Sequence, residues 1–284
     1  MLIVTGATGR LGSKIVNRLL ERVPADRVGV SVRDVRKAAG LAARGVRVRA
    51  GDFTDPATLE HAFEGAERVL VISAAIRGDA ATAANLAAVD AARAAGVRRI
   101  LYTSHQAASP GSLFPPQRVH AATEEHLKRQ DVPFTALRNG FYAATLDPYI
   151  GTALETGTLA VPQDGPVSWT AHDDLAEAAA LALAEEGAFD GITPPLTAPR
   201  TLDFADVAAI VTRITGRRIE RVVVDDEEWM AASGLPRPVA EFMLTLFTAS
   251  RKGEFDVTGP ALESAIGHPA TSVEEALRAT LGSR

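Results

Sequence analysis

Short apolar runs and longer amphipathic stretches alternate along the first half of the chain. The apolar runs predict β-strands, and the stretches in which apolar residues recur at helical spacing predict helices. The predicted strands are Met1–Val4, Arg27–Val32, Val46–Arg49, Arg68–Ile72, Arg98–Thr103 and Pro133–Leu137. The predicted helices are Arg10–Arg22, a helix that begins at Asp55-Pro56, Ala80–Ala95 and Val119–Gln130. This regular alternation predicts an α/β protein with a doubly wound parallel sheet, whose ligand lies at the carboxyl ends of the strands.

The pattern changes to shorter elements beyond Asp147. The expected strands and helices of this region are Thr158–Val161, Val167–Thr170, Asp174–Glu185, Leu202–Thr215, Ile219–Val224, Glu227–Ser233 and Pro238–Arg251. The last helix has a single apolar face, which favours core packing, with a substrate lid or a homodimer contact as alternatives. We therefore predict a cofactor part in residues 1–142 and a smaller C-terminal α+β part in residues 143–284 that caps the substrate.

A glycine-rich turn follows the first predicted strand, and a helix begins directly after it. The sequence of this region is MLIVTGATGRLG. The first glycine permits the tight turn, the second lets the backbone approach a pyrophosphate, and the third lets the helix pack on the strand. The helix N-terminus attracts negative charge. This context predicts a dinucleotide site in a Rossmann-type fold, formed by Gly6, Ala7, Thr8, Gly9, Arg10, Leu11 and Gly12.

The ends of the next three strands supply further candidates for cofactor contact. The second strand ends at Arg33, where an acidic residue would bind a ribose 2′-hydroxyl and an arginine would bind a 2′-phosphate. The residues after the third strand could border the adenine or serve only in a turn, and the small residues after the fourth leave room for ribose and nicotinamide. These candidates are Asp52, Phe53, Ser73, Ala74 and Ala75.

Polar and aromatic residues end the fifth and sixth strands. The candidates beside the cofactor are Asn139, Gly140, Phe141 and Tyr142. The candidates for substrate contact are Ser104, His105, Phe141, Tyr142 and Trp169. Aromatic rings at a strand end suit stacking against a flat acceptor, although the same rings are also typical of a core. The connection from His105 to Arg118 is a candidate active-site loop, from which Phe114 could close the pocket.

Composition excludes several classes of chemistry. The net charge of −5 and the absence of a basic stretch argue against nucleic acid as a partner. No apolar run reaches the roughly 18 residues that a membrane span needs, so we expect a cytoplasmic protein without a membrane partner. The chain has no cysteine, and its six histidines lack metal-ligand spacing. We therefore expect no metal site, and redox chemistry requires a bound cofactor.

Six sequence segments resemble the NmrA-like group of atypical short-chain dehydrogenases. They are TGATGRLG at Thr5, SVRD around Arg33, AGVRRILYTS at Ala95, HAATE at His120, LRNGFY at Leu137 and IGHP at Ile266. The resemblance implies NADPH as the cofactor, with no flavin and no metal. It also implies hydride transfer to a quinone or a similar conjugated acceptor. The alternative that it leaves open is an NADP-binding redox sensor without turnover.

The catalytic residues depart from the wider superfamily. Typical members activate a carbonyl with Tyr-x-x-x-Lys. Here no tyrosine has a lysine four residues later, and the corresponding helix carries His120 and Glu124 instead. We predict that His120 is a proton donor or an orienting group because its unperturbed pKa lies near the working pH, with Glu124 holding its ring. Asn139 is the second catalytic candidate, as a hydrogen-bond donor, whereas the role of Ser104 near the usual serine position stays open.

Overall fold

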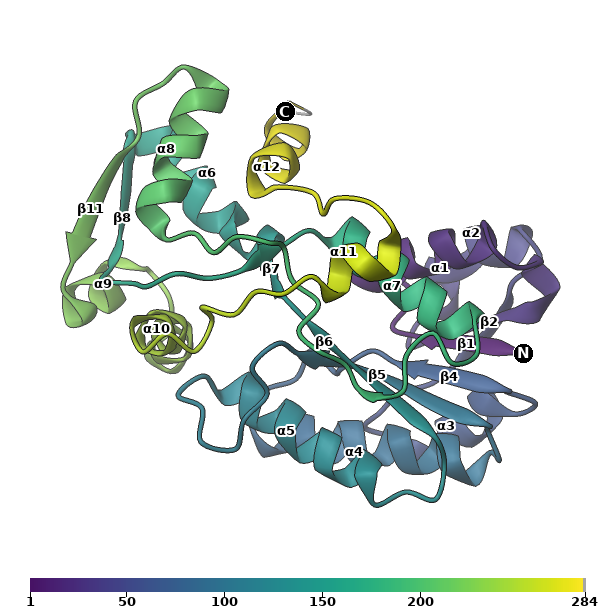
Figure 1. The fold of residues 1–284 in the computed structure, drawn as a ribbon. Coiled ribbons are helices and arrows are strands. Elements are labelled where there is room, and N and C mark those ends of the chain that lie inside the picture. The colour runs from purple at the N-terminus through teal and green to yellow at the C-terminus, as the bar shows by residue number, and fades with distance from the viewer. Residues whose placement is uncertain (283–284) are drawn as a thin grey trace. The chain divides into compact units, whose positions relative to one another are not determined.

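The computed structural model describes residues 1–282, and a seven-stranded sheet is its central feature (Figure 1). The strands are β1 (Leu2–Thr5), β2 (Val28–Val32), β3 (Arg47–Ala50), β4 (Arg68–Val71), β5 (Arg99–His105), β6 (Phe134–Asn139) and β10 (Gly191–Ile192). Their order is β10-β6-β5-β4-β1-β2-β3, and all neighbouring pairs are parallel. The predicted doubly wound, Rossmann-type sheet is therefore confirmed. Its order reverses at β1, so the ends of β1 and β4 border the crevice in which such sheets bind ligands.

Helices cover both faces of this sheet (Figure 1). One face carries α3 (Pro56–Phe63), α4 (Asp79–Ala94) and α5 (Pro115–Lys128), and the other carries α1 (Arg10–Leu20) and α7 (His172–Ala184). The short helix α2 (Ala39–Ala43) lies between β2 and β3 in the sequence. Residues of β1, β4 and β5 share a buried apolar core with α3, α4 and α5. The apolar stripe that the sequence predicts on α1 is buried, and α1 packs on α7.

The helix α5 begins earlier than its apolar pattern predicts. Its first two residues are Pro115 and Pro116, whereas the predicted start is Val119. Proline suits the first turn of a helix because the N–H groups there have no intrahelical partner. The connection after β5 is therefore shorter than predicted and ends at Phe114.

The chain forms two compact units that are not continuous in sequence. Unit 1 comprises residues 1–110, 116–139 and 172–194, and unit 2 comprises residues 111–115, 140–171 and the chain from Pro195 onward. This division differs from the single boundary after Tyr142 that the sequence predicts. The reason is that α7 and β10 complete the sheet unit, α7 by packing on α1 and β10 by pairing with β6.

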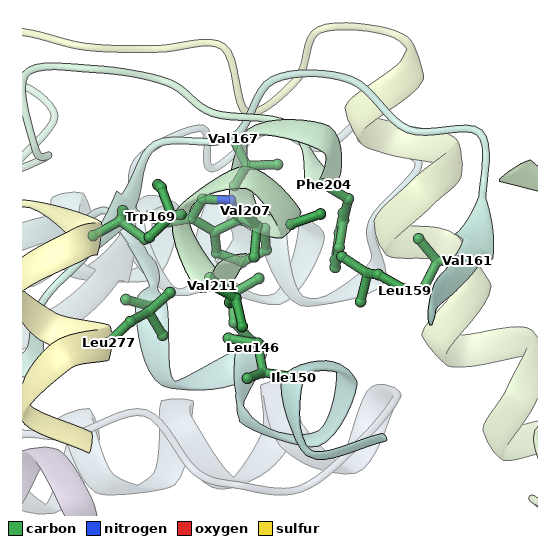
Figure 2. Close-up of a cluster of buried hydrophobic side chains, with 14 of the residues drawn as sticks. Leu146, Ile150, Leu159, Val161, Val167, Trp169, Phe204, Val207, Val211 and Leu277 are labelled. Carbon is green, nitrogen blue, oxygen red and sulfur yellow. The ribbon is translucent and has the colours of Figure 1, made fainter. Parts of the chain in front are cut away.

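Unit 2 combines short strands with helices. Its elements are β7 (Phe141–Tyr142), α6 (Asp147–Thr156), β8 (Thr158–Pro162), β9 (Trp169–Thr170), α8 (Phe204–Thr215), β11 (Glu220–Val224), α9 (Asp226–Ala232), α10 (Arg237–Arg251), α11 (Ala261–Ile266) and α12 (Val273–Leu281). The strands pair in parallel as β8 with β11 and β7 with β9. Figure 2 shows its apolar core, in which side chains of α6, β8 and α8 surround Trp169 and Phe204. Unit 2 therefore has a core of its own.

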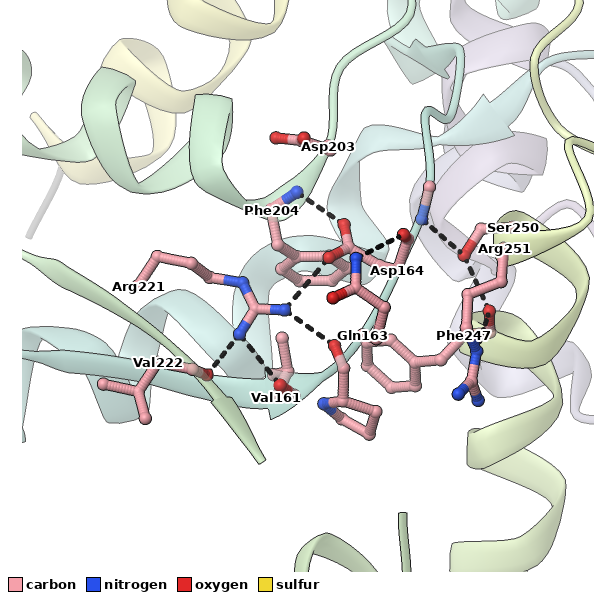
Figure 3. Close-up of polar contacts among 12 residues, drawn as sticks. Val161, Gln163, Asp164, Asp203, Phe204, Arg221, Val222, Phe247, Ser250 and Arg251 are labelled. Atoms are coloured by element: carbon pink, nitrogen blue, oxygen red, sulfur yellow. Dashed lines mark hydrogen bonds and ion pairs between the residues drawn. The ribbon is translucent and has the colours of Figure 1, made fainter. Parts of the chain in front are cut away.

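A buried ion pair supports one side of unit 2 (Figure 3). The guanidinium of Arg221 donates to Asp164 Oδ1 at 3.0 Å and to the carbonyl oxygens of Val161 and Pro162. The other oxygen of Asp164 accepts from the backbone N–H of Phe204 at 2.7 Å. The side chains of Arg221 and Asp164 are only 11% and 7% exposed. This pair thus joins β8, β11 and the start of α8 through charged groups held away from water.

Replacing Tyr149 by phenylalanine is expected to stabilise the protein by about 1 kcal/mol. The Tyr149 hydroxyl is buried without a hydrogen-bond partner within residues 1–282, and burial raises the pKa of Tyr149 above its ordinary value. Its ring packs edge-on against Phe204 and Phe247, and phenylalanine would keep these contacts. Thermal unfolding of wild type and Tyr149→Phe measures the effect. A clearly lower melting temperature for the variant would contradict it.

Candidate cofactor and active site

The glycine turn after β1 has the close backbone approaches that a dinucleotide site needs. Gly6 has a φ of +59°, and its carbonyl oxygen accepts from the N–H of Gly9 at 3.0 Å. A Cβ on Gly12 would lie 2.3 Å from that same oxygen, so only glycine permits this packing of α1 on the turn. The first turn of α1 contains no acidic residue, and its N-cap residue Gly9 forms no side-chain cap. The N-terminus of α1 therefore retains its affinity for an anion, and the turn fits a pyrophosphate.

One arginine just after β2 has no partner for its guanidinium within the described residues. Arg33 is exposed, and its guanidinium forms no hydrogen bond or ion pair within residues 1–282. By contrast, Arg36 binds Asp34 through two hydrogen bonds of 2.9 and 3.0 Å. Since Gly6 donates its N–H to the carbonyl of Ser31, the end of β2 lies directly beside the glycine turn. Arg33 is therefore free to bind a phosphate near this turn.

The chain beyond β4 is held by side chains of its neighbours. The N–H groups of Ile72, Ser73 and Ala74 donate to Thr5 Oγ1, Thr103 Oγ1 and Asn85 Oδ1 respectively, at 2.8 to 2.9 Å. The sequence prediction includes Ser73, Ala74 and Ala75 but misses the three residues that position them. Asn85 could have been singled out from the sequence, because it is an amide in an otherwise alanine-rich helix, and the structure shows that it is buried. These bonds fix the backbone at the edge of the predicted crevice.

Asp52 and Phe53 follow β3 in a tight turn. The carboxylate of Asp52 accepts from the N–H and the hydroxyl of Thr54, and these hydrogen bonds lower the pKa of Asp52. Phe53 packs partly on the core beneath the sheet. Both residues have a structural role in the turn, and contact with an adenine stays a prediction.

His120 lies on α5 beside the end of β5. Its Nδ1 is 2.8 Å from the hydroxyl oxygen of Tyr102, and its ring stacks on His105 with centroids 6.0 Å apart. Burial lowers the pKa of His120 to about 4, and burial together with the neighbouring His120 lowers that of His105 to about 3. The expectation that the pKa of His120 lies near neutral pH is therefore wrong. Both rings are neutral at pH 7, although each keeps part of its surface exposed.

Ser104 and Glu124 form a separate buried cluster. The Ser104 hydroxyl donates to Glu124 Oε1 at 2.6 Å, and Arg138 binds both oxygens of Glu124 at 2.9 and 2.7 Å. Ser104 and Glu124 are each 3% exposed. Ser104 is thus hydrogen-bonded inside unit 1, and its contact with a substrate stays a prediction. The prediction that Glu124 holds the ring of His120 needs correction, because Glu124 binds Ser104 and Arg138 instead.

Asn139 ends β6 and is the clearest candidate for ligand contact in unit 1. It is 1% exposed, yet neither its amide oxygen nor its amide nitrogen has a hydrogen-bond partner within residues 1–282. It pairs in register with His105 on β5, which in turn stacks on His120. A buried amide without partners is costly unless a ligand or water satisfies it. The residues at this edge therefore fit a polar ligand such as the nicotinamide of a dinucleotide.

The remaining predicted residues belong to unit 2. A Cβ on Gly140 would lie 2.1 Å from Thr170 Oγ1, so this position requires glycine for close packing. Phe141 is 7% exposed and packs edge-on against Trp169, while Tyr142 is half-buried. Trp169 is fully buried, and its indole N–H donates to the carbonyl of Leu202. The prediction that Trp169 contacts the substrate is corrected, because its ring lies wholly in the core of unit 2 (Figure 2).

The sequence matches the NmrA-like family over residues 1–279. The chain belongs to the NmrA-like family. Quinone oxidoreductase 2 of Escherichia coli (strain K12) is 32% identical over 283 residues, which cover 98% of this chain and 97% of that protein. NAD(P)H azoreductase of Xenophilus azovorans is 29% identical over 284 residues, with coverage of 98% and 97%.

Solved structures of two similar reductases have the same fold. The crystal structure of the Escherichia coli quinone oxidoreductase in complex with NADPH matches with a TM-score of 0.93 and 31% identity, and covers 99% of this chain and all of that one. Citrobacter sp. triphenylmethane reductase in complex with NADP(H) matches with a TM-score of 0.91 and 33% identity, covering 98% and 99%. The resemblance to the NmrA-like group that the sequence motifs predict is thus confirmed.

Two further properties concern the described part of this NmrA-like chain. Among residues 1–282, no helix is long and apolar enough to cross a membrane. Within the same range, no three histidine, cysteine or acidic side chains gather in a way that could hold a metal ion. A cytoplasmic location, a homodimer and the lack of a nucleic-acid partner stay predictions.

Proposed function

We propose that this protein is an NADPH-dependent, flavin-free enzyme that transfers a hydride to a quinone or a similar conjugated acceptor. The chain is an oxidoreductase, and NADP(H) is its cofactor, as its similarity to NAD(P)H-dependent reductases across nearly the full length indicates. The quinone as acceptor is supported by the named activity of one of these relatives.

The carboxyl edge of the sheet offers a separate group for each part of the cofactor. The turn from Gly6 to Gly12 and the N-terminus of α1 would bind the pyrophosphate, and Arg33 would bind the 2′-phosphate. The unpartnered amide of Asn139 would bind the nicotinamide end. When bound, the nicotinamide supplies the hydride. To unit 2 we assign the capping of the substrate, with the half-buried rings of Phe114 and Tyr142 as candidates for stacking.

The observation that carries the proposal is the buried amide of Asn139, which has no hydrogen-bond partner within residues 1–282 and lies in register with His105, on which His120 stacks. An isolated ketone would become an alkoxide of high pKa, so its reduction needs a proton in the transition state. A quinone becomes a phenolate-type anion whose pKa is close to the ~10 of tyrosine, so hydrogen-bond donors suffice. With a pKa of about 4, His120 is a neutral donor at pH 7, and the amide of Asn139 is another. This site is therefore better suited to a quinone than to a ketone.

The direct test follows NADPH absorbance with a panel of quinones, with no flavin or metal added. We expect oxidation of NADPH by small quinones, and no useful activity on simple ketones or on alcohols with NADP⁺. Rapid alcohol oxidation would contradict the proposal. Tight NADPH binding without turnover across the panel would favour the alternative of a redox sensor.

Arg33→Ala is expected to weaken NADPH binding at least tenfold and to leave NADH binding unchanged. The guanidinium of Arg33 is uncommitted, and a charge-assisted hydrogen bond to a phosphate contributes about 1.5–3 kcal/mol. Calorimetric titration of both cofactors into wild type and variant measures this. Arg36→Ala is the matched control and should have a smaller effect, because Arg36 is bound to Asp34. Equal affinity of the wild type for NADPH and NADH would refute the assignment.

A further inference from the structure

The orientation of the Asn85 amide is set by a backbone group. The N–H of Ala74 can only donate, so the Asn85 atom that it contacts at 2.9 Å must be the oxygen. The amide nitrogen of Asn85 therefore points the other way. Its two hydrogens are directed to Ser73 Oγ and to the hydroxyl of Tyr102, each at 3.2 Å. Asn85 is fully buried, so no competing water reorients it.

Two acceptors lie within reach of the Tyr102 hydroxyl, at clearly different distances. Because it accepts from Asn85, it donates its own proton elsewhere. His120 Nδ1 lies 2.8 Å away, which is an ordinary hydrogen-bond distance, whereas Ser73 Oγ lies at 3.4 Å, where a hydrogen bond is weak. His120 Nδ1 is therefore the acceptor. A neutral imidazole that accepts at Nδ1 carries its proton on Nε2.

We infer that Asn85 and Tyr102 are positioning residues that hold the His120 ring with its proton on Nε2, as a fixed donor to the acceptor atom that gains charge. The Nε2 of His120 forms no hydrogen bond within residues 1–282, and the ring keeps an exposed surface. The identity of the acceptor rests on the proposed function, but the hydrogen-bond chain does not. Because the ring is neutral, His120 orients and stabilises the product anion through a hydrogen bond, and solvent supplies the proton.

The tautomer can be observed without turnover. In protein labelled with ¹⁵N-histidine, protonated and unprotonated ring nitrogens give well-separated NMR signals, and the His120→Gln variant assigns those of His120 by their loss. At pH 7 we expect a protonated Nε2 and an unprotonated Nδ1. A proton on Nδ1 of His120 in the wild type would overturn the inference.

Tyr102→Phe tests the positioning role because it removes the hydroxyl to which we assign the hydrogen bond to His120 Nδ1. We expect the two ¹⁵N signals of His120 to move towards a mixture of tautomers. We also expect kcat for the quinone to fall about tenfold, which corresponds to about 1.4 kcal/mol, with the Kd of NADPH changed by less than about twofold. The control is Tyr149→Phe, which removes a buried hydroxyl without a partner and should change neither property.

The two readouts separate this inference from the proposed function. Unchanged ¹⁵N signals and an unchanged kcat in a folded Tyr102→Phe protein would refute the positioning role, even if quinones are reduced. The expected tautomer in a protein that reduces no quinone would support the hydrogen-bond chain and refute the proposed acceptor.

Discussion

Lowering the pH from 6.5 to 5 is expected to destabilise the folded protein by up to about 3 kcal/mol. The pKa values of His105 and His120 are about 3 and about 4 in the folded state, below the ordinary value of 6.5. The unfolded chain therefore binds more protons in this window, and the stability present above pH 6.5 is lost as the pH falls. The slope is at most about 1.4 kcal/mol per pH unit for each histidine.

Urea denaturation at pH 7 and at pH 5 measures this loss. Carboxylates contribute little between these two values, because their ordinary pKa values of 3.8 and 4.5 lie lower. The comparison variant His105→Asn lacks one of the two titrating rings, so its stability should depend less steeply on pH. Equal stability of the wild type at both pH values would mean that the rings are not held neutral.

Arg221→Met is expected to lower the free energy of unfolding by about 3–5 kcal/mol. The variant keeps most of the side-chain volume but leaves the buried carboxylate of Asp164 without its cationic partner. It also removes the donors that Arg221 supplies to the carbonyls of Val161 and Pro162 (Figure 3). Urea denaturation followed by far-UV circular dichroism measures the change.

An exposed ion pair in the same unit provides the control for Arg221. Arg237 is 57% exposed and binds Glu227, which is 67% exposed, so Arg237→Met should cost less than about 1 kcal/mol. A double variant, Arg221→Met with Asp164→Leu, should recover part of the loss because it removes the unpaired charge. Similar losses of unfolding free energy in Arg221→Met and Arg237→Met would contradict the explanation that burial makes the Arg221–Asp164 pair matter more.

The sheet could be predicted from the sequence because its signals are local. The apolar strands, the amphipathic helices and the glycine turn each lie within a short stretch, and parallel pairing brings all strand ends to one edge. The positions of Gly6, Arg33 and Asn139 at this edge follow directly from that topology. Their contact with NADPH stays a prediction, since it depends on a ligand.

The wrong predictions about the site concern residues whose partners lie on other helices and strands. Ser104 and Glu124 look available from their motifs, but Arg138 binds Glu124 from the neighbouring strand. The pKa of His120 depends on its burial, and burial cannot be derived from one helix. Asn85 was missed because its hydrogen bonds reach two other segments, the turn after β4 and the strand β5. Residue type and spacing predict which side chains reach an edge, but not which of them are already bound.

The discontinuity of unit 1 has a consequence for the order in which the protein can fold during synthesis. The cofactor turn and α1 are made first, but α7, which packs on α1, ends only at Ala184. Until then α1, whose residues Ile15 and Leu19 are buried in the folded protein, lacks the helix on which it packs. Residues 140–171, which belong to unit 2, are made between these two helices. A nascent chain that stops at Tyr142 should therefore need a chaperone, even though it carries the complete glycine turn.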